Sequence, residues 1–236
     1  MAKRRTSGIQ RRERATSEAL NRRLDAGGNR DGGGGATLPD WRLLAIGGVL
    51  LVGVVIIVIV LIMGATPNPN AGVTQPDDGG THVTDGIACR TPADAAQANE
   101  CGGADPYASV PATSGPHWDT PAAWAAYSTP QNESQLVHNL EHGGIVIWYD
   151  PDALDDPQVD ELTSYVEGQV ASGLSGRFKF ILSPWAGSEE LGAPVAVTAW
   201  RHALKPETFD MDAIRAFADA NYLRYAPEPN GGPGPA

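Results

Sequence analysis

The sequence predicts an α+β domain that follows a single membrane-spanning helix. Two observations lead to this expectation: one long uncharged apolar run, and a later alternation of helical and strand-like patterns. The run covers residues 43–63, LLAIGGVLLVGVVIIVIVLIM, and contains no charged residue. A helix rises about 1.5 Å per residue, so this segment is long enough to cross the roughly 30 Å hydrocarbon core of a bilayer. We therefore expect a transmembrane helix at residues 43–63.

The distribution of charge predicts the orientation of this helix. Residues 1–42 hold ten Lys and Arg against five Asp and Glu, whereas the rest of the chain holds seven basic and 23 acidic residues. Basic flanks stay on the cytoplasmic side of a membrane. We expect residues 1–42 to be a disordered basic cytoplasmic tail that contacts anionic membrane lipid, because the segment has too few aliphatic residues to form a core. The protein is then a single-pass protein of the cell membrane, with its C-terminal domain extracytoplasmic.

Composition divides the remainder into three further parts. Residues 64–80 are rich in Pro, Gly and Asn and read as a linker, residues 81–228 as the external α+β domain, and residues 229–236 as a disordered tail. The excess of acidic residues outside the membrane argues against nucleic acid as a partner of the folded domain.

Local patterns predict the regular elements of the external domain. Asn132, with Gln135 three residues later, has the pattern of a helix-starting capping box, and Gly143 suits a helix stop. The expected elements are a helix at 133–142, a strand at 145–149, a helix at 157–171, strands at 177–182 and 195–200, and a helix at 211–223. A parallel crossover followed by an antiparallel return gives a small mixed sheet covered by helices.

The region before these elements, residues 80–129, is expected to form ordered loops closed by a disulfide. Cys89 and Cys101 are the only two cysteines, and both fall on the predicted outer side of the membrane. A pair of cysteines in an oxidising compartment most simply forms a disulfide, and closing a loop of this length stabilises a fold by about 3 kcal/mol. A cysteine-based metal site would need closer spacing or more cysteines.

Histidines are concentrated in one part of the chain. Four of the five histidines in the chain fall within 61 residues: His82, His117, His138 and His142. On a helix, His138, Glu141 and His142 lie within about 100° of one another. Imidazoles with an adjacent carboxylate suit a transition metal such as Zn, Cu(II), Ni or non-haem Fe(II). Cu(I) is less natural, because Met211 is the only methionine after the predicted span. The candidate metal ligands are therefore His82, His117, His138, Glu141 and His142.

Two other interpretations stay open. Histidines near Pro-rich loops often only donate hydrogen bonds to backbone carbonyls, which would make the domain an interaction module with a protein partner in the cell envelope. The spacing His-x-x-Glu-His is also that of inverted zinc peptidases, in which the glutamate activates water, so a metal-dependent hydrolase is a third hypothesis. Such peptidases use a longer helix, whereas Gly143 follows His142 at once, so an enzyme is not the favoured interpretation.

Four stretches resemble a known bacterial family: TSGPHW at 113–118, LVHNLEHGGIVIWY at 136–149, AVTAW at 196–200 and APE at 226–228. Together they are similar to the domain of unknown function 3105, over about residues 82–228. The resemblance implies a domain outside the membrane and emphasises the same five candidate ligands. It implies no reaction, cofactor or substrate. Ala112 departs from the pattern, since members commonly carry a second proline there.

Overall fold

The computed structural model describes residues 48–49, 51–58 and 69–235. The chain forms two units, Met1–Ala65 and Thr66–Ala236. In the first unit, residues 48–49 and 51–58 are helical and the Val, Ile and Leu side chains there are exposed. Among the described residues, no helix is both long enough and apolar enough to cross a bilayer. Most of the predicted span at 43–63, the whole tail at 1–42 and residues 64–68 of the linker lie outside the described residues.

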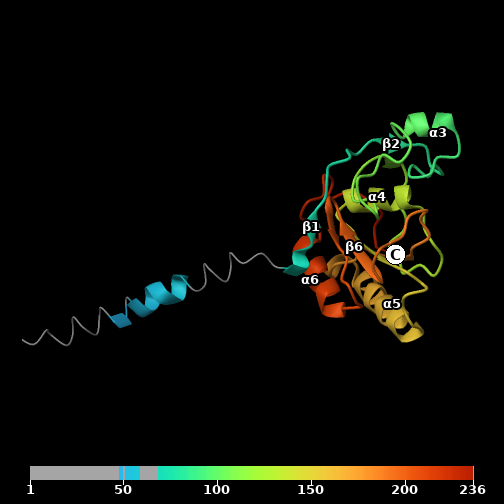
Figure 1. The fold of residues 1–236 in the computed structure, drawn as a ribbon. Coiled ribbons are helices and arrows are strands. Elements are labelled where there is room, and N and C mark those ends of the chain that lie inside the picture. The colour runs from blue at the N-terminus through green and yellow to red at the C-terminus, as the bar shows by residue number, and fades with distance from the viewer. Residues whose placement is uncertain (1–47, 50, 59–68, 236) are drawn as a thin grey trace, which may run out of the picture. The chain divides into compact units, whose positions relative to one another are not determined.

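A five-stranded mixed sheet forms the centre of the second unit (Figure 1). Its strand order is β1-β7-β6-β4-β5. β4 pairs in parallel with β5 and antiparallel with β6, and β7 and β1 continue the antiparallel side. The bounds are β1 Val73–Thr74, β4 Ile145–Tyr149, β5 Phe180–Pro184, β6 Val195–Ala199 and β7 His202–Leu204. The predicted mixed sheet is confirmed.

Helices cover both faces of this sheet. Successive side chains of a strand point to opposite faces. Val146 and Trp148 of β4 therefore pack in one core cluster with Leu136 and Leu140 of α4. The other face of β4 packs against α5 and α6, whose buried residues include Leu162, Val166, Ile214 and Phe217. The helices are α4 Glu133–Glu141, α5 Asp156–Ala171 and α6 Met211–Asn221. Figure 1 shows α4 and the α5–α6 pair on opposite sides of the sheet.

The start and the end of α4 follow local rules. Asn132 Oδ1 accepts a hydrogen bond from the Ser134 backbone N–H at 2.8 Å, which caps the first turn. The helix stops because Gly143 has φ +81°, and a Cβ at this position would lie 2.9 Å from the Cα of Leu223. His142 is therefore the capping residue at the C-terminal end of α4.

The loops before α4 contain two short strands and a short helix. β2, His82–Val83, pairs in parallel with β3, His117–Trp118. α3, Ala95–Glu100, was not predicted: it buries none of its residues, so it has no apolar periodicity to detect. The sulfurs of Cys89 and Cys101 lie at disulfide distance, with their Cα atoms 5.5 Å apart, as expected.

The C-terminal segment differs from the sequence expectation of a disordered tail at 229–236. The buried ammonium of Lys179 donates hydrogen bonds to the carbonyls of Pro229 and Gly231, and the Trp124 indole N–H donates to the carbonyl of Pro233. Two buried donors need acceptors, and this segment supplies them. The segment is thereby held against the domain near the C-terminal end of α4.

Candidate metal centre

Three elements, β2, β3 and α4, carry the candidate ligands. β2 carries His82 and β3 carries His117, and these two residues are direct partners in the parallel ladder. One turn at the C-terminal end of α4 carries His138, Glu141 and His142. One ligand atom of each of His82, His117 and His138 lies within 4.8 Å of those of the other two. The His142 ring centroid lies 4.6 Å from that of His138.

Each of the four imidazoles has its Nδ1 beside an oxygen that accepts hydrogen bonds. Three of these oxygens are backbone carbonyls and one is a carboxylate. The pairs are His82 with Asp119 Oδ1 at 3.1 Å, His117 with Gly115 O at 2.8 Å, His138 with Trp118 O at 2.5 Å, and His142 with Glu228 O at 3.2 Å. A neutral imidazole carries one N–H, and these partners place it on Nδ1. Each Nε2 then carries a lone pair.

These lone pairs converge. The Nε2 atoms of His138 and His142 are 2.8 Å apart. Glu141 Oε2 lies 3.1 Å from Nε2 of His117 and 3.5 Å from Nε2 of His82. The ligand atoms of His82, His117 and His138 lie within 4.8 Å of one another, with Glu141 beside the first two and His142 beside the third. When the rings are neutral, none of these contacts has a hydrogen between its two atoms. Such contacts are repulsive unless a cation, either a proton or a metal ion, lies among the donors.

Burial makes a metal ion the better cation. His117 is fully buried and His138 is 4 % exposed. Desolvation lowers the pKa of both rings, although the Gly115 carbonyl and Glu141 act in the opposite direction on His117 and the Trp118 carbonyl does so on His138. Both rings are therefore neutral at pH 7, which is the state that binds metal. The His82 side chain is more accessible to solvent, with 45 % of it exposed.

The surroundings of the donors are tightly packed. A Cβ at Gly80 would lie 3.0 Å from Glu141 Oε1 and 3.4 Å from the Trp200 ring. The chain just before β2 therefore covers the carboxylate. On the other side, a Cβ at Gly231 would lie 2.4 Å from Cε1 of His142, so the C-terminal segment lies directly on that ring. These contacts fix the positions of the donors.

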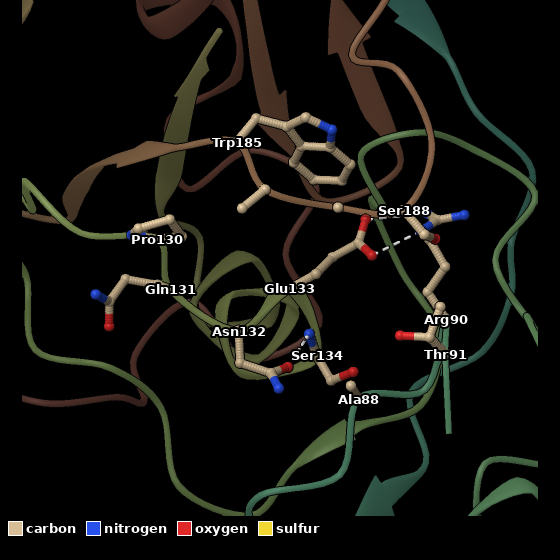
Figure 2. Close-up of a pocket in the computed structure, with 12 residues that line it drawn as sticks. Ala88, Arg90, Thr91, Pro130, Gln131, Asn132, Glu133, Ser134, Trp185 and Ser188 are labelled. Carbon is tan, nitrogen blue, oxygen red and sulfur yellow. Dashed lines mark hydrogen bonds and ion pairs between the residues drawn. The ribbon is translucent and has the colours of Figure 1, made fainter. Parts of the chain in front are cut away.

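A separate pocket of about 250 Å³ lies at the opposite end of α4 (Figure 2). Figure 2 shows the Arg90 guanidinium directed at the Glu133 carboxylate. Arg90 donates to both oxygens of Glu133 at 2.8 and 3.0 Å, and also to Asp105, Glu189 and the Ser109 carbonyl. These bonds occupy all five N–H groups of the guanidinium. The network, which sequence reasoning missed, holds the loops around the N-terminal end of α4.

The structure brings His82, His117 and His138 together, whereas Glu141 is shown beside His82 and His117, and His142 beside His138. Sequence reasoning missed the groups that orient them, namely the Asp119 carboxylate and the carbonyls of Gly115, Trp118 and Glu228. Asp119 directly follows His117 and Trp118 of β3. Its place just after this strand is the one sequence signal that could have indicated its role. The carbonyls carry no side-chain signature.

Comparison with known proteins gives a family but no activity. Residues 101–233, more than half of the chain, match the family model described as "Protein of unknown function (DUF3105)". His117, His138, Glu141 and His142 lie inside this match, and His82 lies before it. Neither a curated protein nor a solved structure matches the chain. The expected resemblance is confirmed, and the chain belongs to the DUF3105 family.

Proposed function

We propose that this protein binds a transition-metal ion through the cluster of His82, His117, His138, Glu141 and His142. One observation carries the proposal: the ligand atoms of His82, His117 and His138 lie within 4.8 Å of one another, and the Nδ1 atom of each of the three rings faces an acceptor, which leaves Nε2 as the free donor. The acceptors at Nδ1 are those that commonly orient metal-binding histidines. All the donors are nitrogen or oxygen, which suits Zn²⁺, Cu²⁺, Ni²⁺ or Fe²⁺.

A purely structural histidine network explains the geometry less well. In a hydrogen-bonded network each contact needs one donor, yet the donors of these rings are already used at Nδ1. The 2.8 Å contact between His138 and His142 would then need an added proton on a ring. For His138, burial opposes that proton. An interaction module without a metal ion is therefore the less favoured interpretation.

The geometry favours binding over hydrolysis. In a metal-dependent hydrolase, the glutamate points at a water beside the ion. Here Glu141 Oε2 lies 3.1 Å from Nε2 of His117 and 3.5 Å from Nε2 of His82, directly beside two of the candidate ligands. We therefore propose metal binding in preference to hydrolysis.

Calorimetric titration of the metal-stripped full chain in detergent micelles, without a histidine tag, tests the proposal. We expect about one Zn²⁺ or Cu²⁺ per chain. His138→Gln should weaken binding by more than about 100-fold, because loss of outer-shell partners alone costs 10- to 100-fold. His202→Gln is the matched control, since His202 is not a candidate ligand: it hydrogen-bonds Thr74 on β1 at 3.2 Å and stacks on Tyr225. Wild-type protein that binds no transition metal would contradict the proposal.

We also propose that the metal-binding domain faces the extracytoplasmic side of the cell membrane, anchored by residues 43–63. The support is the uncharged apolar run, its basic N-terminal flank, and the exposed Val, Ile and Leu side chains in its described part. Alkaline extraction of membranes should leave the chain in the pellet, and protease added to intact cells should remove the domain. Release into the alkaline supernatant would contradict the anchor.

A further inference from the structure

The donors that can share one ion form a set of three. The ligand atoms of His82, His117 and His138 lie within 4.8 Å of one another. Within the part of the chain that the structure describes, this set includes neither Glu141 nor His142. Glu141 lies beside His82 and His117, and His142 lies beside His138. An ion that is held by three protein ligands keeps a further coordination position, which water or another small molecule fills.

The exposed edge of this set is His82. Its side chain is 45 % exposed, whereas the rings of His117 and His138 are buried. Behind His117 stands the indole of Trp200, edge-on to the imidazole, with the two ring centroids 6.4 Å apart. The buried side of the site is therefore filled by the domain itself. A ligand from solvent approaches the ion past His82.

Two carboxylates lie beside the donors on this approach. Glu141 Oε2 is 3.1 Å from Nε2 of His117 and 3.5 Å from Nε2 of His82, and Asp119 Oδ1 is 3.1 Å from Nδ1 of His82. The Glu141 side chain is only 9 % exposed, so water screens its charge weakly. Such a carboxylate repels a second anion and accepts a hydrogen bond from an O–H or N–H group. The free position therefore favours a small neutral ligand that carries one of these groups.

We infer that the ion is bound by His82, His117 and His138 alone and carries one small neutral ligand from solvent, such as water, with Glu141 beside that ligand and not on the ion. The inference rests on the proposed metal-binding function. It deepens that function in two ways, since it separates the three ligands from their two neighbours and names the chemical class of the molecule that the centre takes up.

The relaxation rate of solvent water protons tests this inference in the full chain in detergent micelles. Cu²⁺ is paramagnetic, so water that exchanges on the ion speeds the relaxation of the bulk solvent. We expect faster relaxation with the Cu²⁺-loaded than with the Zn²⁺-loaded chain. Azide, an anion that binds copper, should remove this increase by displacing the water. His202→Gln, the control, should behave as the wild type does.

Glu141→Gln tests the position and the charge of the carboxylate in the same assay. We expect this variant to keep one Cu²⁺ per chain, because Glu141 is not a ligand. The azide concentration that removes the relaxation increase should fall by at least about tenfold, because a weakly screened negative charge beside the open position is lost.

The possible outcomes separate the inference from the proposed function. Relaxation no faster than that of the Zn²⁺-loaded chain would show a closed site and overturn the inference, with metal binding intact. Loss of Cu²⁺ from a folded Glu141→Gln, or an unchanged azide requirement, would overturn the role given to Glu141. Failure of the wild type to bind Cu²⁺ or Zn²⁺ would instead remove the proposed function. If Glu141→Gln does not fold, the wild-type relaxation alone decides whether the position is open.

Discussion

Replacing Lys179 by methionine tests how the C-terminal segment supports the cluster. Lys179 is 6 % exposed, and its ammonium donates to the carbonyls of His142, Pro229 and Gly231 at 2.8, 2.8 and 2.9 Å. Burial lowers the pKa of this ammonium. The three bonds nevertheless tie the end of α4 to the segment that packs on the His142 ring.

The expected decrease in the free energy of unfolding follows from the loss of these three hydrogen bonds. A hydrogen bond to a charged group contributes about 1.5–3 kcal/mol. Three such bonds are offset in large part by the several kcal/mol needed to desolvate the cation. We expect Lys179→Met to lower the free energy of unfolding by about 3 kcal/mol, since methionine fills the volume but leaves three carbonyls without their partner. For a domain of this size, that corresponds to a fall in Tm of about 6–12 °C.

Thermal unfolding of the metal-free full chain in micelles, followed by circular dichroism, measures this fall. Lys205→Met is the matched control, because the partly buried Lys205 donates to a single carbonyl, that of Leu191, at 2.7 Å. We expect it to cost about 1 kcal/mol. Lys179→Met should in addition weaken metal binding about tenfold, as loss of outer-shell support does. Equal Tm values for the two variants would refute the reasoning.

Three further predictions concern the donors themselves. Asp119→Asn should weaken metal binding about tenfold without lowering Tm, because the exposed carboxylate only orients His82; unchanged affinity in a calorimetric titration would contradict this. Gly80→Ala should have a similar effect, since its Cβ would lie 3.0 Å from Glu141 Oε1, and an unaltered Kd would count against the packing described. The folded-state pKa values of His117 and His138 are lowered, so below about pH 6.5 the unfolded metal-free chain binds more protons than the folded chain. Urea unfolding should therefore show that the free energy of unfolding decreases as the pH is lowered below about 6.5. A constant free energy of unfolding from about pH 7.5 to 5.5 would argue against buried neutral rings.

Elements with local signals were predictable from the sequence. α4 and β4 were expected at nearly their observed bounds, because a capping residue, a glycine with positive φ and a short apolar run all lie within one stretch. β5 begins at Phe180, three residues after the expected start, since pairing with Ile145 sets its first residue. β7 was missed because it has three residues and depends on pairing with β6.

Of the whole site, only the candidate metal ligands could be predicted from the sequence. The clustering of histidines in the sequence indicated the five candidate ligands, whereas the groups that orient them are backbone carbonyls or come from distant segments. Glu228, whose carbonyl faces His142, lies 86 residues further along the chain. Lys179 has the appearance of an outward-facing residue in an alternating strand, and its acceptors Pro229 and Gly231 lie 50 and 52 residues away. Contacts between residues so far apart in the chain cannot be predicted from a local sequence pattern.

The most direct test of the account is elemental analysis of the full chain, purified without chelators and without a histidine tag, beside a His117→Ala/His138→Ala double variant. We predict about one equivalent of a single transition metal in the wild type and less than about a tenth of that in the variant, given the loss of two of the five candidate ligands. Equal metal content in the two proteins, or a wild type that is metal-free even after incubation with Cu²⁺ or Zn²⁺, would contradict the central claim that the converging Nε2 atoms form a metal centre.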